Sequence, residues 1–312
     1  MHVYPEAFFV HLKSLAETGR KVVLLMKLLG AVLFIASLFL PSIAAADMLV
    51  GGEDSYPTKK GDCLVLIGAK VGLDWETIAK ENRIEPRNQC KINVRLTFTN
   101  RKIVPRIVED GIIVNIPDRM LYFFKEGTLV SFFPVCLGSR DWQTPVGAFV
   151  IVRKEHDPTW HVPKSIQGEM KKKGQVVKEI VPPGPENPLG RFVLETSLPG
   201  ILIHETIWPT TIYQWRSHGC IRVLPENMEA GFFDLVEKGT RGEIIYQPVS
   251  VAVSEEGRIF LQVDRDIYKM VKSLDEEARG QIEKRGLSEK VDWTKVGNVL
   301  KAKSGIAEDV SL

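Results

Sequence analysis

The sequence predicts an α+β protein in which a mainly β sandwich domain follows a small βααβ module and precedes a helical extension. Three observations support this fold class. The 312 residues suffice for two domains and a further short segment, and a composition of 44% apolar and 26% charged residues is that of a globular chain. Apolar residues have helical spacing over 64–79 and again after 264, whereas 107–150 contains short apolar runs separated by turn signals.

Residues 1–46 have the features of a secretory signal peptide. A basic region (20–27) precedes an apolar run (28–40), and small residues follow up to Ala46, after which cleavage is expected. Met26 is a candidate for the true start. The apolar run is shorter than the ~20 residues of a membrane-spanning helix. We therefore expect an exported protein with no stable membrane span after cleavage, the alternative being an uncleaved anchor.

The charge balance excludes one class of partner. Without residues 1–46, basic and acidic residues are equal in number. The excess of positive charge that proteins use to bind nucleic acids is missing. We therefore expect no nucleic-acid partner.

Residues 55–105 are predicted to form the βααβ module, after a polar linker over 47–55. The first of its helices ends at Gly72, and Asp74 is placed to cap the second. A strand over 94–104 then completes the module.

The four cysteines of the chain are Cys63, Cys90, Cys136 and Cys220, and an exported protein can form disulfides. Cys63 and Cys90 lie in the same short module and could form a bridge that stabilises its small core. Cys136 follows an apolar run and is predicted to be buried in a strand. Cys220 has to stay reduced if it acts as a nucleophile.

Residues 107–247 are predicted to form the mainly β domain. Its strands are expected at the short apolar runs over 112–116, 120–124, 129–137, 191–195, 200–203 and 243–246. A helix over 225–237 is expected to end before Gly239. Residues 153–190 form a long irregular stretch, and a loop of this length in a compact domain usually has a function. We expect it to be a mobile lid over a cleft.

Residues 248–312 are predicted to form a hairpin followed by two helices. The hairpin strands are expected over 249–253 and 259–263, where they could continue the sheet of the preceding domain. The helices are expected over 264–285 and 293–303, and their charged, amphipathic character suits the covering of a face. No residue pattern in this segment indicates chemistry.

The residues best suited to chemistry lie within 204–222, which contains His204, His218 and Cys220. A thiol is only partly ionised near neutral pH and needs a base or a positive field to attack a carbonyl, and an imidazole can supply either. Gly219 allows a tight turn beside the thiol and can bring a backbone N–H close to a substrate oxygen. Each of these residues alone is more often structural, so the interpretation depends on their combination.

The combination of His204 with Ser217-His218-Gly219-Cys220-Ile221-Arg222 resembles the signature of the L,D-transpeptidases, which have a YkuD-like catalytic domain. The resemblance covers most of 107–247. It implies that Cys220 attacks peptidoglycan stem peptides and that His204 accepts and donates the proton. The family usually has glycine where this chain has Glu205, whose backbone carbonyl is then expected to complete the catalytic group.

The resemblance implies further roles around the nucleophile. The N–H groups of Gly219 and Cys220, together with His218, would stabilise the oxyanion, and Arg222 would bind a substrate carboxylate. A surface or interdomain ion pair is an equally good interpretation of Arg222. Ser217 is placed at the substrate-binding side of the motif and is expected to shape the turn rather than to react.

No metal or organic cofactor is expected for this chemistry. The spacing of His204, His218 and Cys220 matches no common zinc motif, and a fourth ligand is not evident. A papain-like protease would need its cysteine before its histidine, which is the reverse of the order in this chain.

The module over 55–105 resembles LysM, a small unit that binds glycans containing N-acetylglucosamine. The matching residues are Tyr56, Gly61-Asp62, Leu64, Gly72, Ile78, Asn82 and Ile103-Val104-Pro105. The alternative interpretation is a small α+β spacer that binds nothing.

The two resemblances together imply an L,D-transpeptidase of the periplasm or cell wall that is acylated by carbapenems. Its partner would be peptidoglycan. The enzyme would form a cysteine thioester, release D-Ala and join the acyl group to an amine, either cross-linking the wall or attaching a protein to it. One alternative is an L,D-carboxypeptidase that uses water at the same site. Another is a non-enzymatic peptidoglycan-binding wall protein.

Overall fold

A computed structural model describes residues 47–90 and 93–312 of the protein. Residues 47–312 belong to a single compact unit. The expected signal peptide over 1–46 lies outside the described residues. Within the described ranges, no helix is both long and apolar enough to cross a bilayer.

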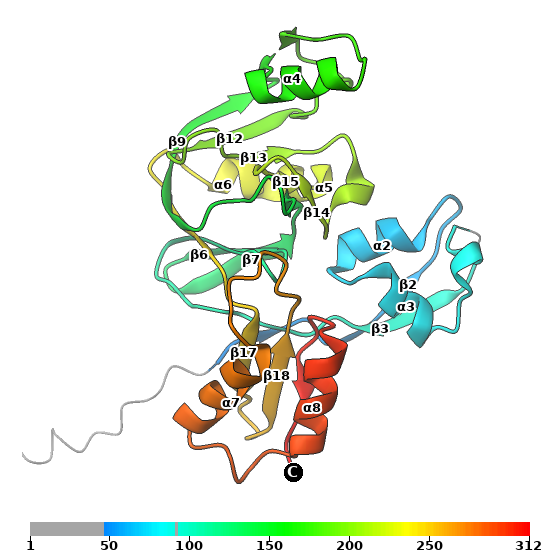
Figure 1. Ribbon diagram of the computed structural model, residues 1–312, viewed down its shortest axis with the longest axis vertical. Coiled ribbons are helices and arrows are strands. Elements are labelled where there is room, and N and C mark those ends of the chain that lie inside the picture. Colours follow the sequence, from blue (N-terminus) through cyan, green and yellow to red (C-terminus); the bar gives the residue numbers. More distant parts are fainter. Residues whose placement is uncertain (1–46, 91–92) are drawn as a thin grey trace, which may run out of the picture. The chain divides into compact units, whose positions relative to one another are not determined.

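The N-terminal module has the predicted order of strand, helix, helix and strand (Figure 1). Strands β2 (Glu53–Pro57) and β3 (Arg95–Thr99) pair in antiparallel fashion, and α2 (Leu64–Val71) and α3 (Trp75–Glu81) lie between them in sequence. A short 3-10 helix, η1 (Pro86–Asn88), follows α3. As predicted, α2 ends at Gly72, which has a left-handed φ of 72° that costs glycine little.

The segment expected to be a linker is instead part of a sheet. Strand β1 (Leu49–Val50) pairs with β4 (Lys102–Ile103), and Gly51 and Gly52 make the turn that leads into β2. The strand predicted over 94–104 is consequently split in two. It is interrupted at Asn100, whose side-chain oxygen accepts a hydrogen bond of 3.0 Å from the Gly52 N–H.

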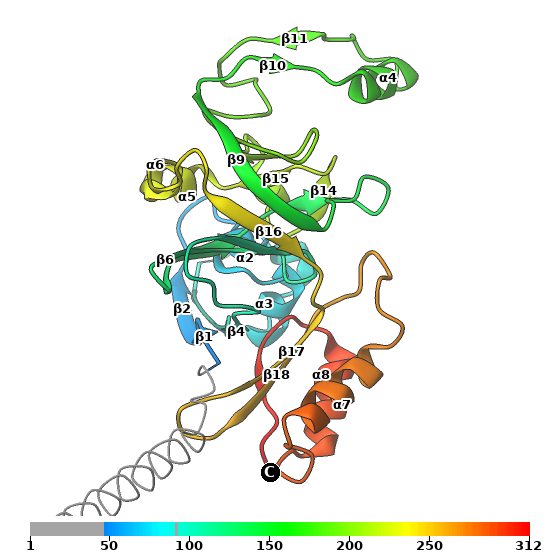
Figure 2. The same cartoon turned by 90° about the vertical axis from the view of Figure 1, so that its left-hand side faces the viewer.

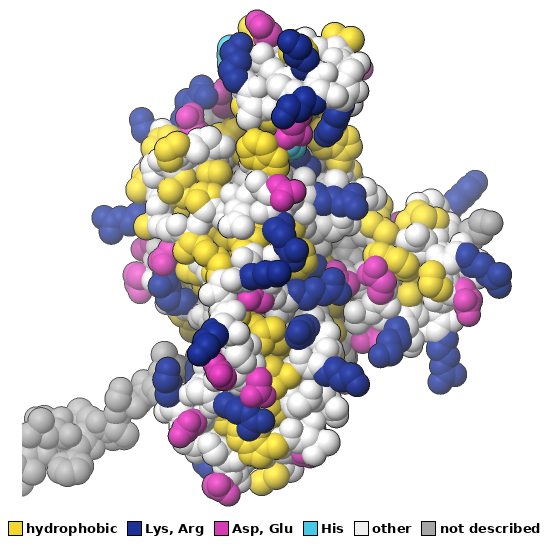
Figure 3. Space-filling view, in the orientation of Figure 1, with side chains coloured by type: hydrophobic (Ala, Val, Ile, Leu, Met, Phe, Trp, Pro, Cys, Tyr) yellow, Lys and Arg dark blue, Asp and Glu magenta, His cyan; other side chains and the backbone are white. Residues whose placement is uncertain are grey.

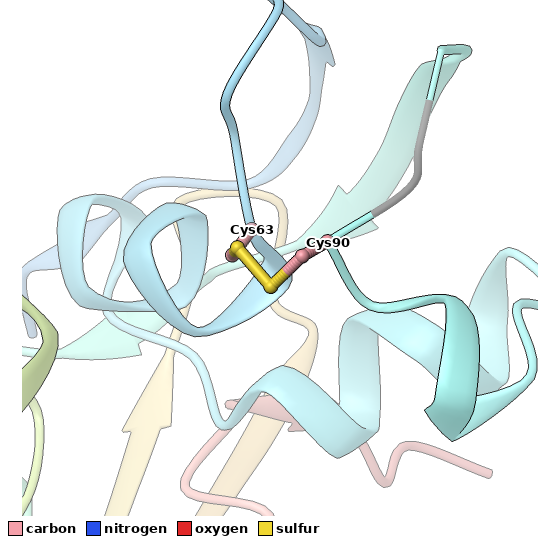
Figure 4. The surroundings of a disulfide bond; sticks show 2 residues. All are labelled: Cys63 and Cys90. Atoms are coloured by element: carbon pink, nitrogen blue, oxygen red, sulfur yellow. A yellow bond between two sulfur atoms is a disulfide. The ribbon is translucent and has the colours of Figure 1, made fainter.

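The predicted disulfide between Cys63 and Cys90 is present (Figure 4). Cys63 is the residue before α2, and Cys90 follows η1. A backbone hydrogen bond from Leu64 to Gln89 holds the same two segments together. The bridge therefore joins the start of the first helix to the chain that leaves the second.

The central element is an eight-stranded sheet with the strand order β15-β13-β12-β9-β16-β5-β6-β7. In chain order its strands are β5 (Gly111–Asn115), β6 (Met120–Lys125), β7 (Thr128–Pro134), β9 (Gly147–His156), β12 (Phe192–Thr196), β13 (Leu202–Glu205), β15 (Ile221–Val223) and β16 (Arg241–Ile245). The pairs β13 with β15 and β5 with β16 are parallel, and the others are antiparallel. Strand β16, expected to close the domain, lies in the middle of the sheet.

Both faces of this sheet are covered by apolar side chains, which makes the domain mainly β and sandwich-like. Ile112 and Val114 of β5 belong to one core cluster, whereas Ile113 between them belongs to another. This alternation follows from the period of two residues along a strand. Cys136 is fully buried in the second cluster, as predicted.

Two predicted segments of this domain differ from the structure. Residues 153–190, expected to be irregular, contain the end of β9, the strands β10 (Trp160–His161) and β11 (Ile180–Val181), and the helix α4 (Lys164–Lys172). The helix expected over 225–237 is broken into α5 (Pro225–Asn227), a single π-turn, η3 (Met228–Phe232), and α6 (Phe233–Leu235). Gly231 interrupts it with a φ of 110°, which is not helical.

The C-terminal extension forms a sheet of its own rather than continuing the large one. Strands β17 (Val249–Val253), β18 (Ile259–Val263) and β19 (Glu308–Asp309) pair in that order. Helices α7 (Leu274–Lys284) and α8 (Trp293–Ala302) pack beside β17 and β18 (Figure 1).

The first helix of the extension is shorter than predicted. Residues 264–273 are not helical, because the Asp266 carboxylate accepts hydrogen bonds from the backbone N–H groups of Met270 and Val271 and thereby favours a turn. Ser273 then caps α7 by accepting a hydrogen bond from the Glu276 N–H.

Candidate active site

Two neighbouring strands bring the predicted nucleophile and base together. Parallel pairing of β13 with β15 sets Ile203 opposite Ile221 and His204 opposite Arg222. Cys220 is the residue directly before β15. Because side chains alternate along a strand, Cys220 is placed on the sheet face that His204 and Arg222 share. The apolar strands thus aim the reactive side chains, as expected for a site built on rigid elements.

His204 is almost fully buried and held in one orientation. Its Nδ1 lies 2.6 Å from the backbone oxygen of Glu205. A carbonyl can only accept, so Nδ1 carries the proton in the neutral ring and Nε2 is left as the basic nitrogen. This is the contact that the sequence assigns to the Glu205 carbonyl; its catalytic role remains a prediction.

The environment keeps His204 neutral at physiological pH. Burial lowers its pKa to about 4 and the charge of Arg222 acts in the same direction, while backbone contacts with Glu205 and Leu189 oppose the shift. The imidazole is therefore available as a proton acceptor throughout the neutral range.

Cys220 is half-buried and its sulfur lies 3.5 Å from the Gly200 carbonyl oxygen. Burial raises the pKa of the thiol, although a backbone contact with Leu202 and the charge of Arg222 lower it. The thiol thus holds its proton and His204 accepts none at rest. Such a neutral pair can react if the proton moves to His204 as the sulfur attacks.

The catalytic turn (residues 217–220) is held by hydrogen bonds of its own. The Ser217 hydroxyl donates to the Cys220 backbone oxygen at 2.6 Å and accepts from the Gly219 N–H at 3.1 Å. Gly219 has a φ of 105°, a conformation that favours glycine. Ser217 is buried and shapes the turn in this way. The Gly219 N–H is occupied by this hydroxyl, so an oxyanion would have to compete with Ser217 for it.

The ring of His218 lies against α4. Its Nε2 is 3.2 Å from each carboxylate oxygen of Glu169, and the centroid of its ring is 5.2 Å from that of Trp142. The sequence placed His218 at the oxyanion, which remains a prediction. No local sequence pattern predicts its contact with Glu169, because the two residues lie far apart in the chain.

Arg222 faces the site with unused hydrogen-bonding capacity. Within the described ranges, its buried Nε has no hydrogen-bond partner and its side chain forms no ion pair. Its guanidinium lies 5.4 Å from the ring centroid of Trp208. A charged side chain beside a nucleophile and without a counter-charge is suited to binding an anionic group.

Glu205, found where the resembling family has glycine, points its side chain away from the reactive face. Its carboxylate lies 3.6 Å from the Arg191 guanidinium and packs against Gly190. A side chain at Gly190 would place its Cβ 2.6 Å from the Glu205 Cβ. The larger residue at 205 is thus accommodated by a glycine in the neighbouring segment.

Two residues that the sequence did not single out, Thr144 and Tyr268, support the catalytic turn through a network of hydrogen bonds. Thr144, which is buried, donates from its hydroxyl to the Gly219 carbonyl at 2.9 Å and accepts from the Gly138 N–H at 2.8 Å. The Tyr268 hydroxyl donates to the Gly138 carbonyl at 2.7 Å and accepts from the Thr144 N–H at 3.1 Å. Tyr268 belongs to the C-terminal extension, for which the sequence indicated no role at the site.

The described part of the chain contains no group of three or more His, Cys, Asp or Glu side chains arranged to hold a metal ion. The site consists of a thiol, an imidazole oriented by a carbonyl, and an unpaired guanidinium.

Comparison with known proteins assigns this arrangement to a family. Residues 109–251 match the family model of the YkuD L,D-transpeptidase catalytic domain. The probable L,D-transpeptidase ErfK/SrfK of Salmonella typhimurium is 29% identical over 69% of this chain and 72% of its own length. Its Escherichia coli counterpart is 32% identical over 57% of this chain and 58% of its own length.

A third relative, the probable L,D-transpeptidase YbiS of Escherichia coli, is 31% identical over 54% of this chain and 55% of its own length. The chain thus matches little more than half the length of the two Escherichia coli relatives. The catalytic domain of the Enterococcus faecium L,D-transpeptidase acylated by ertapenem matches 44% of this chain and 98% of its own, with 24% identity and a TM-score of 0.35. A TM-score this low adds nothing to the assignment, which the family model and the relatives carry. Over residues 109–251, the chain is an L,D-transpeptidase catalytic domain of the YkuD family.

Proposed function

We propose that the protein is an exported L,D-transpeptidase that acts on peptidoglycan stem peptides through a thioester at Cys220. The observation that supports this most strongly is the parallel register of β13 and β15. It sets His204, oriented by the Glu205 carbonyl, on the same sheet face as the thiol and beside Arg222. A nucleophile, an oriented base and an unpaired cation on one face are what acyl transfer from an anionic peptide requires.

The first half of the reaction forms the acyl-enzyme. The Cys220 sulfur attacks the carbonyl that joins the third stem residue to the terminal D-Ala, while its proton passes to Nε2 of His204. The Cys220 N–H stabilises the oxyanion that forms, together with the Gly219 N–H once the oxyanion has displaced the Ser217 hydroxyl from it. The carbon–nitrogen bond then breaks, His204 returns its proton to the leaving amine, and D-Ala departs from a thioester.

The second half transfers the acyl group. An acceptor amine gives its proton to His204 as it attacks the thioester, a new amide forms, and the thiol is regenerated with the returned proton. If water takes the place of the amine, the product is a tripeptide and the enzyme acts as an L,D-carboxypeptidase. The acceptor, whether a second stem peptide or a protein amine, thus decides the biological outcome.

Substrate binding is assigned to Arg222 with Trp208. The Arg222 side chain is half-buried and forms no ion pair within the described ranges, so its guanidinium could bind a carboxylate of the stem peptide. The exposed ring of Trp208 beside the guanidinium offers an apolar surface to the same peptide.

The α4 strap (residues 157–191) is assigned the role of a lid. In Figure 2 it projects from the end of β9, with α4 at its far end. Helix α4 contains no buried residue and its lysines are exposed. Figure 3 shows dark-blue Lys and Arg side chains at this end of the molecule. The contact between Glu169 and His218 connects the strap to the catalytic turn. A helix with so little buried surface can move at low energetic cost.

The N-terminal module over 55–105 is assigned the role of binding wall glycans, and the segment over 1–46 that of an export signal. The module has the strand, helix, helix and strand order that its resemblance to LysM implies. Glycan binding by this module would hold the catalytic domain close to its substrate and raise the effective substrate concentration.

The proposal is tested with the chain from Asp47 onward and a purified disaccharide-tetrapeptide, with Cys220→Ala as control. Mass spectrometry should show loss of D-Ala and formation of a cross-linked dimer, and neither product with the variant. Loss of D-Ala that leaves only tripeptide would indicate the carboxypeptidase reaction. If the folded, reduced protein and the variant gave the same spectra, the protein would be better described as a non-enzymatic wall-binding protein.

A further inference from the structure

A buried lysine connects the C-terminal extension to the segment before the catalytic turn. Lys102 is almost fully buried, and its ammonium donates to the Tyr213 hydroxyl at 2.7 Å and to the Gly305 carbonyl at 2.6 Å. The same ammonium lies 3.3 Å from the Asp118 carboxylate. Burial alone would lower the pKa of Lys102, but Tyr213, Asp118 and Asp264 raise it, so the ammonium stays charged.

An arginine contacts the same tyrosine at its ring and its backbone carbonyl. The Arg119 guanidinium donates to the Tyr213 carbonyl at 3.0 Å and lies 3.7 Å from the centroid of the Tyr213 ring. It also lies 4.2 Å from the ring of Trp215 and donates to the Asp74 carboxylate at 2.8 Å. Asp74 begins α3 of the N-terminal module, yet its side chain makes no capping hydrogen bond to that helix. It serves instead as the counter-charge of Arg119.

Tyr213 adopts a backbone conformation that its residue type does not favour. Its φ is 61°, in the left-handed region, where a large side chain is strained. Such a conformation persists only where the surroundings enforce it. Here the enforcing contacts are the hydrogen bonds and ring contacts of Lys102 and Arg119 with the buried tyrosine.

Tyr213 lies shortly before the catalytic turn in the chain, separated from it by one short strand. Strand β14 (Trp215–Ser217) follows and pairs in parallel with β8 (Leu137–Gly138). The Tyr213 N–H donates to the Val135 carbonyl at 3.2 Å, which fixes where this pairing begins. At the other end of β14, the Ser217 hydroxyl holds the backbone of Gly219 and Cys220. The position of Tyr213 therefore sets the register of β14 against β8 and, through β14, the position of the catalytic turn.

We propose that Tyr213 is a positioning residue for Cys220: held by its contacts with Lys102 and Arg119, it couples the packing of the N-terminal module and the C-terminal extension to the position of the catalytic turn. Within the described residues, the tyrosine forms no hydrogen bond with Cys220 or His204, so its role would be indirect. This inference rests on the proposed function, because it assigns a cause to the reactivity of the same thiol.

The test measures the acylation of Cys220 by ertapenem. Mass spectrometry detects the adduct, and stopped-flow absorbance over a range of inhibitor concentrations measures the rate at which it forms. Such a series separates the affinity of the first, non-covalent complex from the maximal rate constant of acylation. The variant is Tyr213→Phe, which removes the hydroxyl that Lys102 binds and keeps the ring between the two cations. The matched control is Tyr122→Phe. Tyr122 is equally buried, and its hydroxyl bonds to Asp118 in the same cluster, but it lies on β6 away from the catalytic turn.

We expect both variants to lower the melting temperature to a similar extent, because each loses one buried hydroxyl from the same network. Tyr213→Phe should also reduce the maximal acylation rate constant by about 10-fold to 100-fold, as small displacements of reacting groups do, with little change in the affinity of the first complex. Tyr122→Phe should leave the rate constant within about twofold of the wild type, because its hydroxyl bonds to Asp118 and not to Tyr213 or the catalytic turn, so its loss displaces no reacting group.

Three outcomes overturn the inference: an unchanged rate constant in Tyr213→Phe, an equal loss in both variants, or a loss confined to affinity. If the wild type formed no adduct with ertapenem, the proposed function would fail before the inference was reached. Alkylation of Cys220 by iodoacetamide then gives an independent readout. Folded Tyr213→Phe should differ from the wild type in the rate of Cys220 alkylation, and Tyr122→Phe should not.

Discussion

His204 ties the catalytic site to the stability of the fold. Its pKa is about 4 in the folded protein, because burial and Arg222 disfavour the charged ring, whereas an exposed histidine titrates near 6.5. Between these values the unfolded chain binds a proton that the folded protein does not. The folded state is therefore destabilised as the pH falls from about 6.5 to about 4, by up to ~3 kcal/mol in total from this group.

The prediction is that His204→Gln weakens this dependence on pH. Chemical denaturation of the wild type and the variant, from pH 7.5 down to pH 4.5, measures the free energy of unfolding at each pH. As the pH falls, the wild type should lose more unfolding free energy than the variant, so the stability of the variant relative to the wild type should rise. His161→Gln is the matched control, since His161 is exposed on the α4 strap. A difference that did not vary with pH would contradict the assignment of a neutral, buried His204.

Cys220 should react slowly as a free thiol. Burial raises its pKa, and a neighbouring imidazole that stays neutral provides no positive charge to offset this. Because the thiolate is the nucleophile, alkylation by iodoacetamide should be slow at pH 7 and should accelerate beyond pH 9. Mass spectrometry of the alkylated peptide measures this, and buried Cys136 should remain unmodified. A rate that levels off below pH 7 would indicate a thiolate–imidazolium pair and would contradict this view.

The sequence indicated candidate reacting residues but not those that support them. Cys220 and His204 could be proposed because their chemistry requires particular residue types within a short stretch, and the Glu205 carbonyl because of the resemblance to a family; all three roles remain predictions. Thr144, Tyr213 and Tyr268 could not, because their roles arise from contacts between segments far apart in the chain. A threonine or tyrosine has no distinctive pattern until the fold shows what its hydroxyl touches.

Among the elements, the α4 strap contacts the catalytic turn through the Glu169 carboxylate and the His218 ring. Exposed polar contacts of this kind contribute little to stability. Glu169→Gln should therefore speed hydrogen exchange of the α4 amides by no more than about fivefold, and the same change should alter the mobility of the His218 ring. Exchange mass spectrometry measures the first effect. Glu179→Gln, which alters an exposed pair 3.9 Å from Lys164 on the same strap, should not affect His218.

The disulfide acts on the N-terminal module, whose small core gives it little stability of its own. Bridging Cys63 and Cys90 restricts the unfolded chain over a separation of 27 residues. The Cys63→Ser, Cys90→Ser double variant should lose about 2–4 kcal/mol of unfolding free energy. Denaturation with and without a reducing agent checks this: the reductant should destabilise the wild type and leave the double variant unchanged. Equal sensitivity of the two proteins would mean that the bridge contributes nothing.

Helices and strands were predictable where local residue patterns specify them, and less predictable where pairing with distant segments specifies them. The strand pairs around the Lys125–Gly127 and Glu256–Gly257 turns appear as expected, because turn residues and alternating apolar residues specify hairpins. The helix expected over 264–285 starts ten residues later because Asp266 stabilises a turn. The place of β16 in the middle of the sheet depends on a parallel pairing with β5 that no local pattern encodes.

At the scale of the whole molecule, three segments meet at a buried group of charges. Lys102 comes from the end of the N-terminal module, Asp118 and Arg119 from the turn between β5 and β6, and Asp264 from the C-terminal extension. Gln262 donates to both Asp118 and Asp264. The two segments that flank the catalytic domain in sequence are thus joined to it through buried polar contacts, and removing either one would leave charges uncompensated.

Asp264 should therefore titrate in the direction opposite to His204. Burial and the neighbouring Asp118 raise its pKa to about 6, against the attraction of Lys102, the hydrogen bond from Gln262 and the charge of Arg119. The unfolded chain releases this proton near pH 4, so between pH 4 and pH 6 the folded protein holds more protons, and its stability falls as the pH rises.

Asp264→Asn keeps the uncharged shape at every pH. Relative to the wild type, the variant should gain stability between pH 4.5 and pH 7.5, as measured by urea denaturation, whereas His204→Gln should lose it over the same interval. If Asp264→Asn instead became less stable relative to the wild type as the pH rose, the ionised carboxylate would be stabilising the junction. The attraction of Lys102 would then outweigh the cost of burying the charge of Asp264.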